Sequence, residues 1–572
     1  MNKSVSFSCN YKKKIAFLPV VALIAIIITQ VAISVFYINQ KSGFHIDEFY
    51  SHTQANGRLL RGQAHRDWEI YNQWHSSAFF NNYLTVQEGE RFDFIPVYHT
   101  LSRNIHPPFF HMQLHAASSL FPNLFSKWIG TTINIIWLSA ATVLLYLTAK
   151  IVLKNNYLAL LPSLIWGLSS GAISIVLFIR MYAILTFFFV AIMYLGVLII
   201  NGNHKFYYKA DKCVSSEKDN SLIEKTKKKF YIFLGLTFFF GFFTHFYFII
   251  FFALVAVMIL FWLIYKKDII QIRNCIIVIL ISFLVYIAAW PNVFHRIFVS
   301  SRGRESFYSA VNFDDTQNRL YEFSKLFLNE DALPRQLSLI VFAFLIIFGV
   351  GIVLLVKRKV HIKNILEPHN YLVLFIAVCT VSYYLIVAQI APIKCARYHY
   401  AIYPSVMLLL VSILHHIMIY MYSIKTRYTS IILTIICLFV VFAGFSNRQV
   451  SHLYPDVPDV SSIIQELDSP VCIYLFTDRL LYFELLLYDF TLFENTFICR
   501  ETSNNDIFHY FRTALHGIER GEDLIIYISS EMDYEFLNHV HDILYEYFYI
   551  EGIQIFYTSQ GFRSYDAYKV IW

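Results

Sequence analysis

Residues 15–50 read IAFLPVVALIAIIITQVAISVFYINQKSGFHIDEFY, a long apolar run that ends just before two adjacent carboxylates. The apolar part, 15–37, exceeds the roughly 20 residues that a helix needs to cross a bilayer. It is too long for a signal-peptide core and no small-residue cleavage site follows it, so the sequence predicts a retained membrane-spanning helix. Asp47 and Glu48 then lie at the water–lipid boundary, where acids can hold a metal ion or take a proton from a hydroxyl group.

The composition of the whole chain is that of a membrane protein with many spans. Hydrophobic residues make up 57% of the sequence and charged residues 15%, and the mean hydropathy is +0.51. Soluble domains carry about 25% charged residues, which argues against a soluble globular protein. The net charge of +7 does not require nucleic acid, because most of the surplus Lys and Arg lies in short loops, where it sets membrane orientation. The cysteines form no CxxC pair, and Cys472 and Cys499 are compatible with a disulfide or with two buried thiols.

Hydropathy and length predict about eleven membrane spans. They lie near 15–37, 129–149, 156–175, 182–200, 231–244, 247–265, 274–290, 336–356, 370–390, 401–421 and 428–445. With a cytoplasmic N-terminus, every basic loop between them falls on the cytoplasmic face, as the positive-inside rule requires. These loops are Lys12–Lys14, Lys150–Lys154, Lys205–Lys229, Lys266–Arg273, Lys357–Lys363 and Lys425–Arg427. The sequence therefore predicts an all-α polytopic membrane domain.

Three sizeable segments lie outside the membrane in this topology: 38–128, 291–335 and 446–572. The first is too long for a simple connector and is the expected catalytic loop. In the last, hydropathy drops, and Val471–Phe476 and Leu524–Ile528 have the pattern of short buried strands. Asp533–Tyr547 has the apolar face of an amphipathic helix. The sequence thus predicts a membrane domain over 1–445 and a small extracytoplasmic α/β domain over 446–572.

Polar residues that are unusual in so apolar a chain gather on the outer side of the predicted membrane. They are Asp47 and Glu48, His106 with His111 and His115 behind it, Arg180 and Tyr182, His245, Arg296, Arg302 and Arg304, and Arg397 with Tyr398. Singly, an Arg or Tyr at a helix end often only anchors the helix at the interface, and a lone His is more often a packed, hydrogen-bonded residue. Together, acids in the first loop and arginines at later outer ends predict a cavity that holds a metal or a base beside an anionic phosphate.

Four of these sequences, taken in order, resemble a known class of enzyme. They are Asp47-Glu48 after the first span, His106-Pro107-Pro108 before an interfacial helix, Arg180-Met181-Tyr182 after the third span, and Arg397-Tyr398 before a late span. The pattern resembles the polytopic C-type (GT-C) glycosyltransferases. The most similar branch is the bacterial dolichyl-phosphate-mannose protein mannosyltransferase-like family, which includes the aminoarabinose transferases of lipid A. The resemblance covers residues 10–420.

The resemblance implies a fold of many transmembrane helices with catalytic loops on the extracytoplasmic face. It also implies a sugar linked to a polyprenyl phosphate, such as undecaprenyl phosphate, as the donor. The sugar would pass with inversion to a glycan, lipid or protein of the cell envelope. No Asn-x-Ser/Thr sequon occurs in the predicted outer segments, which favours a bacterial inner membrane over an endoplasmic reticulum.

The resemblance also implies roles for individual residues. Asp47 would be the base that takes the acceptor proton, and Glu48 would assist it or orient a metal or the acceptor. The donor phosphate would be bound by His106, Arg180, Tyr182, Arg397 and Tyr398. Accessory residues would be His45, His245, Arg302 and Arg304. A divalent metal ion, if one takes part, would be held by Asp47, Glu48 and His106.

The sequence departs from the family's pattern at two places. Two other functions are also compatible with it. Asn104 and Ile105 stand before His106 where relatives often carry an acid, and 446–572 has no counterpart, so its role is open. An O-antigen polymerase or ligase also carries Arg and His in outer loops, but typically in one large loop late in the chain. A transporter or flippase usually carries ionisable residues near the bilayer midplane, and the predicted spans have hardly any.

Overall fold

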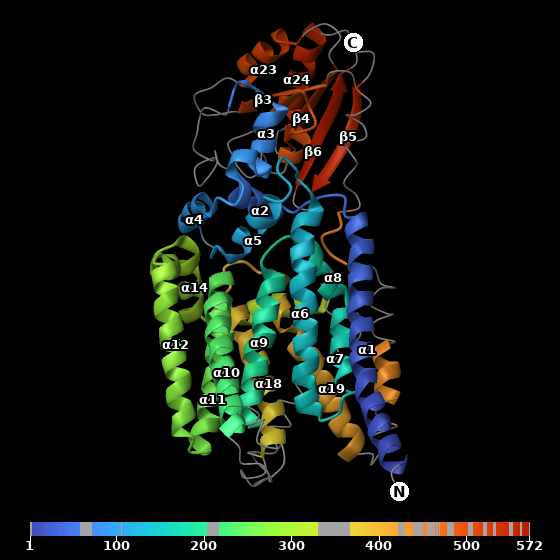
Figure 1. Ribbon diagram of the computed structural model, residues 1–572. Helices are drawn as coiled ribbons and strands as arrows, with labels where there is room; N and C mark the ends of the chain where they lie inside the picture. The colour runs from blue at the N-terminus through green and yellow to red at the C-terminus, as the bar shows by residue number, and fades with distance from the viewer. Residues whose placement is uncertain are drawn as a thin grey trace.

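A computed structural model gives the arrangement of the chain (Figure 1). It describes residues 3–57, 71–104, 106–202, 217–329, 367–420, 428, 431–438, 450–454, 464, 467, 470–476, 486–500, 507–518, 523–529, 534–547, 553–560 and 563–570. Long helices stand side by side in a bundle, a layer of short helices covers one end of the bundle, and a β-sheet lies beyond that layer (Figure 1). The first helix begins at the end of the bundle that is remote from the sheet (Figure 1).

Six helices among the described residues are long and apolar enough to cross a membrane. They are Phe17–Gln40 of α1 (Lys3–Gln40), α6 (Lys127–Leu153), α9 (Tyr182–Ile200), α11 (Tyr247–Tyr265), α12 (Ile269–Ala289) and Asn370–Ile390 of α18 (Pro368–Ile390). Two more helices, α10 (Glu217–Thr244) and α19 (Tyr403–Tyr420), run in the same bundle (Figure 1). The predicted fold class, a helical membrane bundle with a small α/β region outside it, is confirmed.

The predicted span at 156–175 is a broken helix. α7 (Leu160–Gly167) and α8 (Ser170–Leu177) meet at a bend of 56°. Ser169 starts the second piece, because its Oγ accepts the backbone N–H of Ala172 at 3.1 Å and so caps the helix N-terminus. The predicted span at 336–356 and half of the one at 428–445 lie outside the described residues, so the count of eleven stays a prediction.

The first of the segments predicted to lie outside the membrane, 38–128, folds into the layer of short elements. Its helices are α2 (Ile46–Asn56), α3 (Ser77–Leu84), α4 (Phe94–Ser102) and α5 (Phe109–Ser118), and β1 (Trp74–Ser76) lies among them. The helix expected after His106-Pro107-Pro108 is confirmed as α5. The end of α2 is fixed to its neighbours through Asn56, whose Nδ2 donates to the carbonyl of Leu84 at 2.9 Å and to Ser118 Oγ at 3.1 Å.

The sheet has the strand order β1-β3-β2-β4-β6-β5. Its later strands are β2 (Val471–Phe476), β3 (Asn495–Arg500), β4 (Leu524–Ser529), β5 (Ile553–Gln560) and β6 (Arg563–Val570). β2 pairs in parallel with β3 and with β4, and the other pairs are antiparallel. The two strands predicted from buried apolar runs are confirmed as β2 and β4, and the predicted amphipathic helix as α24 (Tyr534–Tyr547). Cys472 and Cys499 are buried free thiols.

The sheet is not built from the C-terminal segment alone. β1, from the first outer segment, pairs antiparallel with β3 and sets Trp74 opposite Phe497. The hydrophobic core on one side of the sheet is shared in the same way: Phe49 of α2 and Phe80 of α3 pack in one cluster with Phe490 of α22 (Leu487–Phe490). The predicted domain boundary at 446 therefore does not enclose the whole sheet or its core.

The second segment predicted to lie outside the membrane, 291–335, lies beside the layer of short helices and contacts α4 through Ser102. It contains α13 (Val293–Phe298), α14 (Ser301–Val311) and α15 (Thr316–Asn329). Arg319 of α15 donates to the carbonyls of Gln389 and Ala391 at 3.2 and 2.9 Å and to Ser309 Oγ at 3.0 Å. These bonds fix α14 against the outer end of α18, so that one face of α14 is held at the edge of the candidate site.

Candidate active site

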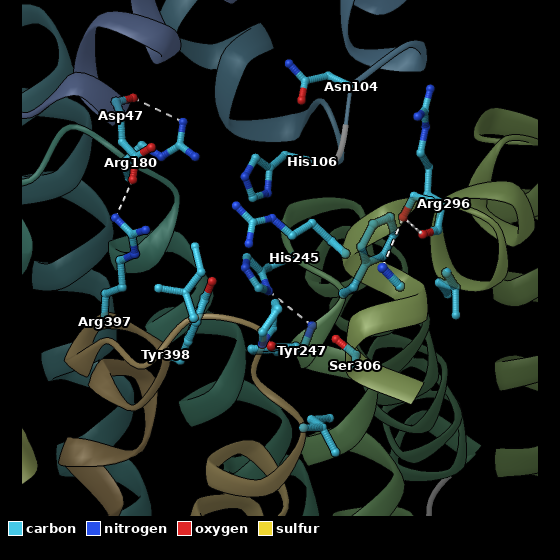
Figure 2. Close-up of a pocket in the computed structure, with 18 of the residues that line it drawn as sticks. Asp47, Asn104, His106, Arg180, His245, Tyr247, Arg296, Ser306, Arg397 and Tyr398 are labelled. Atoms are coloured by element: carbon cyan, nitrogen blue, oxygen red, sulfur yellow. Dashed lines mark hydrogen bonds and ion pairs between the residues drawn. The ribbon is translucent and has the colours of Figure 1, made fainter. Parts of the chain in front are cut away.

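A cavity of about 700 Å³ lies where the layer of short helices meets the outer ends of the long helices (Figure 2). One wall is polar and comes from α2 and α4, and another is apolar and comes from α11 and the segment after α18. Among the described residues that line the cavity, Asp47 is the single carboxylate. The arginines that line it are Arg103, Arg180, Arg296, Arg302 and Arg397. The cavity is therefore strongly cationic around one acid.

The N-terminus of α2 holds Asp47 in a fixed place. His45 Nδ1 accepts the backbone N–H of Asp47 at 3.0 Å, and the Glu48 carboxylate accepts the backbone N–H of His45 at 2.6 Å. This reciprocal capping box satisfies N–H groups that a helix start would otherwise leave unpaired. Asp47 thus stands in the first turn of the helix, where the helix dipole stabilises a negative charge.

Two arginines from distant parts of the chain hold Asp47 (Figure 2). Arg397 Nη1 forms a close ion pair with Asp47 Oδ2. Arg180 Nη1 donates to the backbone carbonyl of Asp47 at 3.1 Å and to Ser51 Oγ at 3.2 Å. Burial would raise the pKa of Asp47, but the charges of Arg180 and Arg397 outweigh burial and hold that pKa below its ordinary value. Asp47 is therefore ionised at neutral pH.

Glu48, expected to assist Asp47, does not line the cavity. Its side chain is fully buried, and its Oε2 accepts from Lys41 Nζ at 3.0 Å as well as from His45. Its Oε1 accepts the backbone N–H of Ile179 at 2.9 Å. Because both oxygens are engaged, Glu48 ties the end of α1 and the loop before Arg180 to the start of α2. The structure thus places Glu48 outside the cavity lining, and its expected role beside Asp47 stays a prediction.

Two of the expected accessory residues also lie outside the cavity lining. His45 caps α2, and its ring packs edge-on against Phe178 at 5.5 Å and against His452 at 6.3 Å. Arg304 is exposed on α14. His45 therefore contributes to the site through the position of Asp47, and Arg304 has no contact with the cavity.

The other expected residues come together in the cavity: Asp47, His106, Arg180, Tyr182, His245, Arg302, Arg397 and Tyr398. The His245 ring lies 6.0 Å from the ring of His106 and 6.0 Å from the ring of Tyr182. Figure 2 shows His106 and His245 next to each other in the cavity. Burial, and then the charge of Arg180, holds the pKa of His106 well below its ordinary value. His106 is therefore neutral at neutral pH, so a bound phosphate would find its positive charge on the arginines.

The residues expected to hold a metal ion do not form a ligand set. The Glu48 oxygens are engaged by Lys41 and by backbone N–H groups, and the Asp47 carboxylate is paired with Arg397. Within the described part of the chain, no group of three or more His, Cys, Asp or Glu is placed to hold a metal. Asp47, Glu48 and His106 thus do not fit a divalent ion together.

The polar wall of the cavity was missed by sequence reasoning. It contains Tyr50, Thr53 and Gln54 of α2 and Thr100 of α4. Tyr50 and Gln54 follow Asp47 at i+3 and i+7, a spacing that places all three on one face of a helix, and this periodicity was the available signal. Thr100 carries no comparable signal, because α4 reaches the cavity only through its packing in the layer of short helices.

No family model matches the sequence, and no curated protein matches it. ArnT from Cupriavidus metallidurans bound to undecaprenyl phosphate is 9% identical with a TM-score of 0.46, over 97% of this chain and 98% of that one. The same protein in the apo state is 10% identical with a TM-score of 0.46, over 96% and 97%. The Archaeoglobus fulgidus oligosaccharyltransferase in the apo form is 11% identical with a TM-score of 0.44, over 90% of this chain and 69% of that one.

Proposed function

We propose that this protein is a multi-pass glycosyltransferase that moves a sugar from a polyprenyl phosphate carrier to an acceptor on the outer side of a bacterial inner membrane. The observation that carries the proposal is the setting of Asp47, an ionised carboxylate that faces the cavity between Arg180 and Arg397. Such a transfer needs a base for the attacking hydroxyl group and cations for the departing phosphate. Here the base would be Asp47, and the cations would be Arg180 and Arg397, which both contact it.

The wall on the membrane side suits the lipid part of such a donor. Ile249 and Ile250 near the start of α11, and Ile390 and Ile393 at the end of α18 and just after it, give this wall its apolar surface. A polyprenyl chain can lie against them while its phosphate reaches the guanidinium of Arg397. One guanidinium group can donate two parallel hydrogen bonds to two phosphate oxygens, a geometry that the lysine ammonium does not provide.

Arg397 is the residue that both the base and the donor phosphate require. In the resting site it pairs with Asp47. A donor phosphate competes for the same guanidinium, and loss of the ion pair would raise the pKa of Asp47 towards its ordinary value. Asp47 then becomes the stronger base once the donor is in place. We infer that the site in this way withholds its base until a phosphate arrives.

This arrangement supports the following chemical step. Asp47 takes the proton of the acceptor hydroxyl while the acceptor oxygen bonds to the anomeric carbon of the sugar. The bond between that carbon and the phosphate oxygen breaks on the opposite face, so the configuration inverts. The electron pair stays on the phosphate, which leaves as free polyprenyl phosphate stabilised by Arg180 and Arg397.

Release of free polyprenyl phosphate by the purified, reconstituted protein tests the proposal. A panel of polyprenyl-phosphate sugars is offered to the wild type and to Asp47→Asn, which keeps the shape of the side chain and removes the base. Asp314→Asn is the matched control, because Asp314 is an exposed acid that does not line the cavity. We expect release from the wild type and the control and a loss of about 10⁴-fold or more in Asp47→Asn. Full activity of Asp47→Asn would refute the assignment, and transfer of a whole oligosaccharide would identify a polymerase or ligase.

A further inference from the structure

The polar wall of the cavity begins at the base itself. Asp47, Tyr50 and Gln54 lie on one face of α2 and all three line the cavity, with Thr53 beside them. Thr100 of α4 lines the cavity as well and is 3% exposed. A ligand bound along this wall would therefore present its groups to α2 within two helical turns of Asp47.

Two buried polar atoms in this wall have no hydrogen-bond partner among the described residues. They are Gln54 Oε1 and Thr100 Oγ1. Buried polar atoms in folded proteins nearly always have partners, because an unsatisfied one loses its hydration without compensation. Since both residues line the cavity, a ligand bound there could form the hydrogen bonds that these two atoms lack.

The chemistry of the wall selects one class of ligand. Gln54 Oε1 can only accept a hydrogen bond, so the ligand must bring an O–H or N–H donor to it. A phosphate or carboxylate oxygen cannot donate. A cationic ligand is disfavoured, because the cavity is lined by five arginines and by one carboxylate within the described chain. Neutral hydroxyl groups, which donate and accept, match both Gln54 and the hydroxyl of Thr100.

We propose that Gln54 and Thr100 form a subsite for the hydroxyl groups of an uncharged sugar unit. The proposal deepens the proposed function and rests on it, since Asp47 at the start of the same face would then meet a hydroxyl group of a sugar held by the wall. In this arrangement the arginines bind the phosphate, and Gln54 and Thr100 bind hydroxyl groups of the sugar. The sugar unit belongs either to the donor or to a glycan acceptor.

Binding of soluble sugars to the full-length protein in lipid nanodiscs tests the subsite directly. Saturation-transfer NMR with methyl glycosides of neutral hexoses compares the wild type with Gln54→Met and Thr100→Val, which keep the side-chain shape and remove the polar atom. We expect the wild type to bind and each variant to bind about tenfold more weakly. Gln73→Met is the matched control, because Gln73 is exposed outside the cavity, and it should bind as the wild type does.

The outcomes separate the subsite from the proposed function. No glycoside binding by the wild type, or equal binding by the wild type and both variants, would overturn the subsite. Undecaprenyl phosphate without a sugar is measured in parallel, and the two variants should keep its affinity. An equal loss of glycoside and undecaprenyl phosphate would show a general defect and would also overturn the subsite. Failure of the wild type to bind undecaprenyl phosphate would count against the proposed function and leave the glycoside result standing.

A third probe, undecaprenyl phosphate carrying a hexose, identifies the source of the sugar. If the wall holds the donor sugar, Gln54→Met and Thr100→Val should bind this lipid no more tightly than bare undecaprenyl phosphate. If the wall holds the acceptor, both variants should bind the lipid as the wild type does and still lose the methyl glycoside when the lipid is present. Either pattern supports the subsite, and wild-type binding of every probe by both variants would refute it.

Discussion

At the scale of single residues, Arg180 and Arg397 set the proton affinity of Asp47. A base acts only when ionised, so activity falls as pH drops through its pKa, and the two arginines keep that acid limb below the ordinary carboxyl range. Arg397→Gln removes one of the charges, so we expect the acid limb of the kcat/KM profile to move to higher pH. The rate should also fall by about 10²- to 10³-fold, because the departing phosphate loses a partner.

A pH profile of sugar transfer from pH 3 to 9 measures both effects of Arg397→Gln. Arg304→Gln is the matched control, since Arg304 is exposed on the same side of the molecule and does not line the cavity. An acid limb that keeps its position in Arg397→Gln would contradict Asp47 as the base.

Glu48 and Lys41 form a buried ion pair whose loss should affect stability more than chemistry. Both side chains are fully buried, and their atoms meet at 3.0 Å. Glu48→Gln leaves the Lys41 ammonium without its countercharge, which costs about 3–5 kcal/mol and lowers the unfolding temperature. The double variant Lys41→Met with Glu48→Gln removes both charges and should regain most of that loss. Thermal unfolding in detergent of the wild type, Lys41→Met, Glu48→Gln and the double variant checks this. Losses of stability that simply add up in the double variant would argue against the pair.

The pair of acids could be found from the sequence, but their division of labour could not. Successive side chains on a helix point about 100° apart, so Asp47 and Glu48 lie on different parts of the surface of α2. Which of them faces the cavity depends on where α2 packs, and Lys41 and Ile179 decide this from outside the helix. The low pKa that makes His106 neutral likewise depends on burial and on Arg180, which no local pattern encodes.

At the scale of elements, α6 and the loop before Arg180 fit together through a glycine. A Cβ placed on Gly130 of α6 would lie 2.1 Å from Ile179 Cγ2, so one of the two must move. The backbone N–H of Ile179 donates to Glu48, and the next residue is Arg180. We expect Gly130→Ala to lower kcat about tenfold through a displaced Arg180 and to cost about 1–3 kcal/mol of stability.

The double variant Gly130→Ala with Ile179→Ala makes the prediction specific. It removes the clashing methyl group, so kcat should return towards that of Ile179→Ala alone. Gly89→Ala is the control, because a Cβ there meets nothing within 4 Å. Steady-state kinetics of the wild type, the two single variants, the double variant and Gly89→Ala decide the matter. An unchanged kcat in Gly130→Ala would show that the loop tolerates the shift.

The elements that the sequence predicted are those whose signal is local. β2 and β4 are continuous apolar runs, and every residue of β2 is buried. β1 has no such signal, because Trp74–Ser76 becomes a strand only by pairing with β3, more than 400 positions later. The bend between α7 and α8 is also invisible to hydropathy, since both pieces are apolar and the break depends on the cap that Ser169 supplies. The hydropathy pattern therefore could not predict β1, which depends on distant strand pairing, or the bend between α7 and α8, which depends on a side-chain cap.

At the scale of the whole molecule, the outer sheet and the site share one hydrophobic core. Phe49 of α2, two residues after Asp47, belongs to the cluster that contains Phe490 and Tyr527 beneath the sheet. The C-terminal segment and the helix that carries the proposed base therefore share one hydrophobic core. A change that loosens this core should loosen α2 as well, and Asp489 offers a way to test it.

Asp489 is buried in α22 beside that core, and burial raises its pKa to about 7. In the unfolded chain its pKa is near 4, so the folded protein binds the proton more tightly. The stability that this proton contributes is complete below pH 4 and is lost as pH rises towards 7, with a slope on the order of 1 kcal/mol per pH unit. Asp489→Asn keeps a neutral side chain at every pH, so its unfolding temperature should vary less across this window. Hydrogen exchange of α2 should accelerate from pH 5 to 8 beyond the intrinsic rate in the wild type and not in Asp489→Asn. Acceleration confined to the sheet would show that the two parts unfold independently.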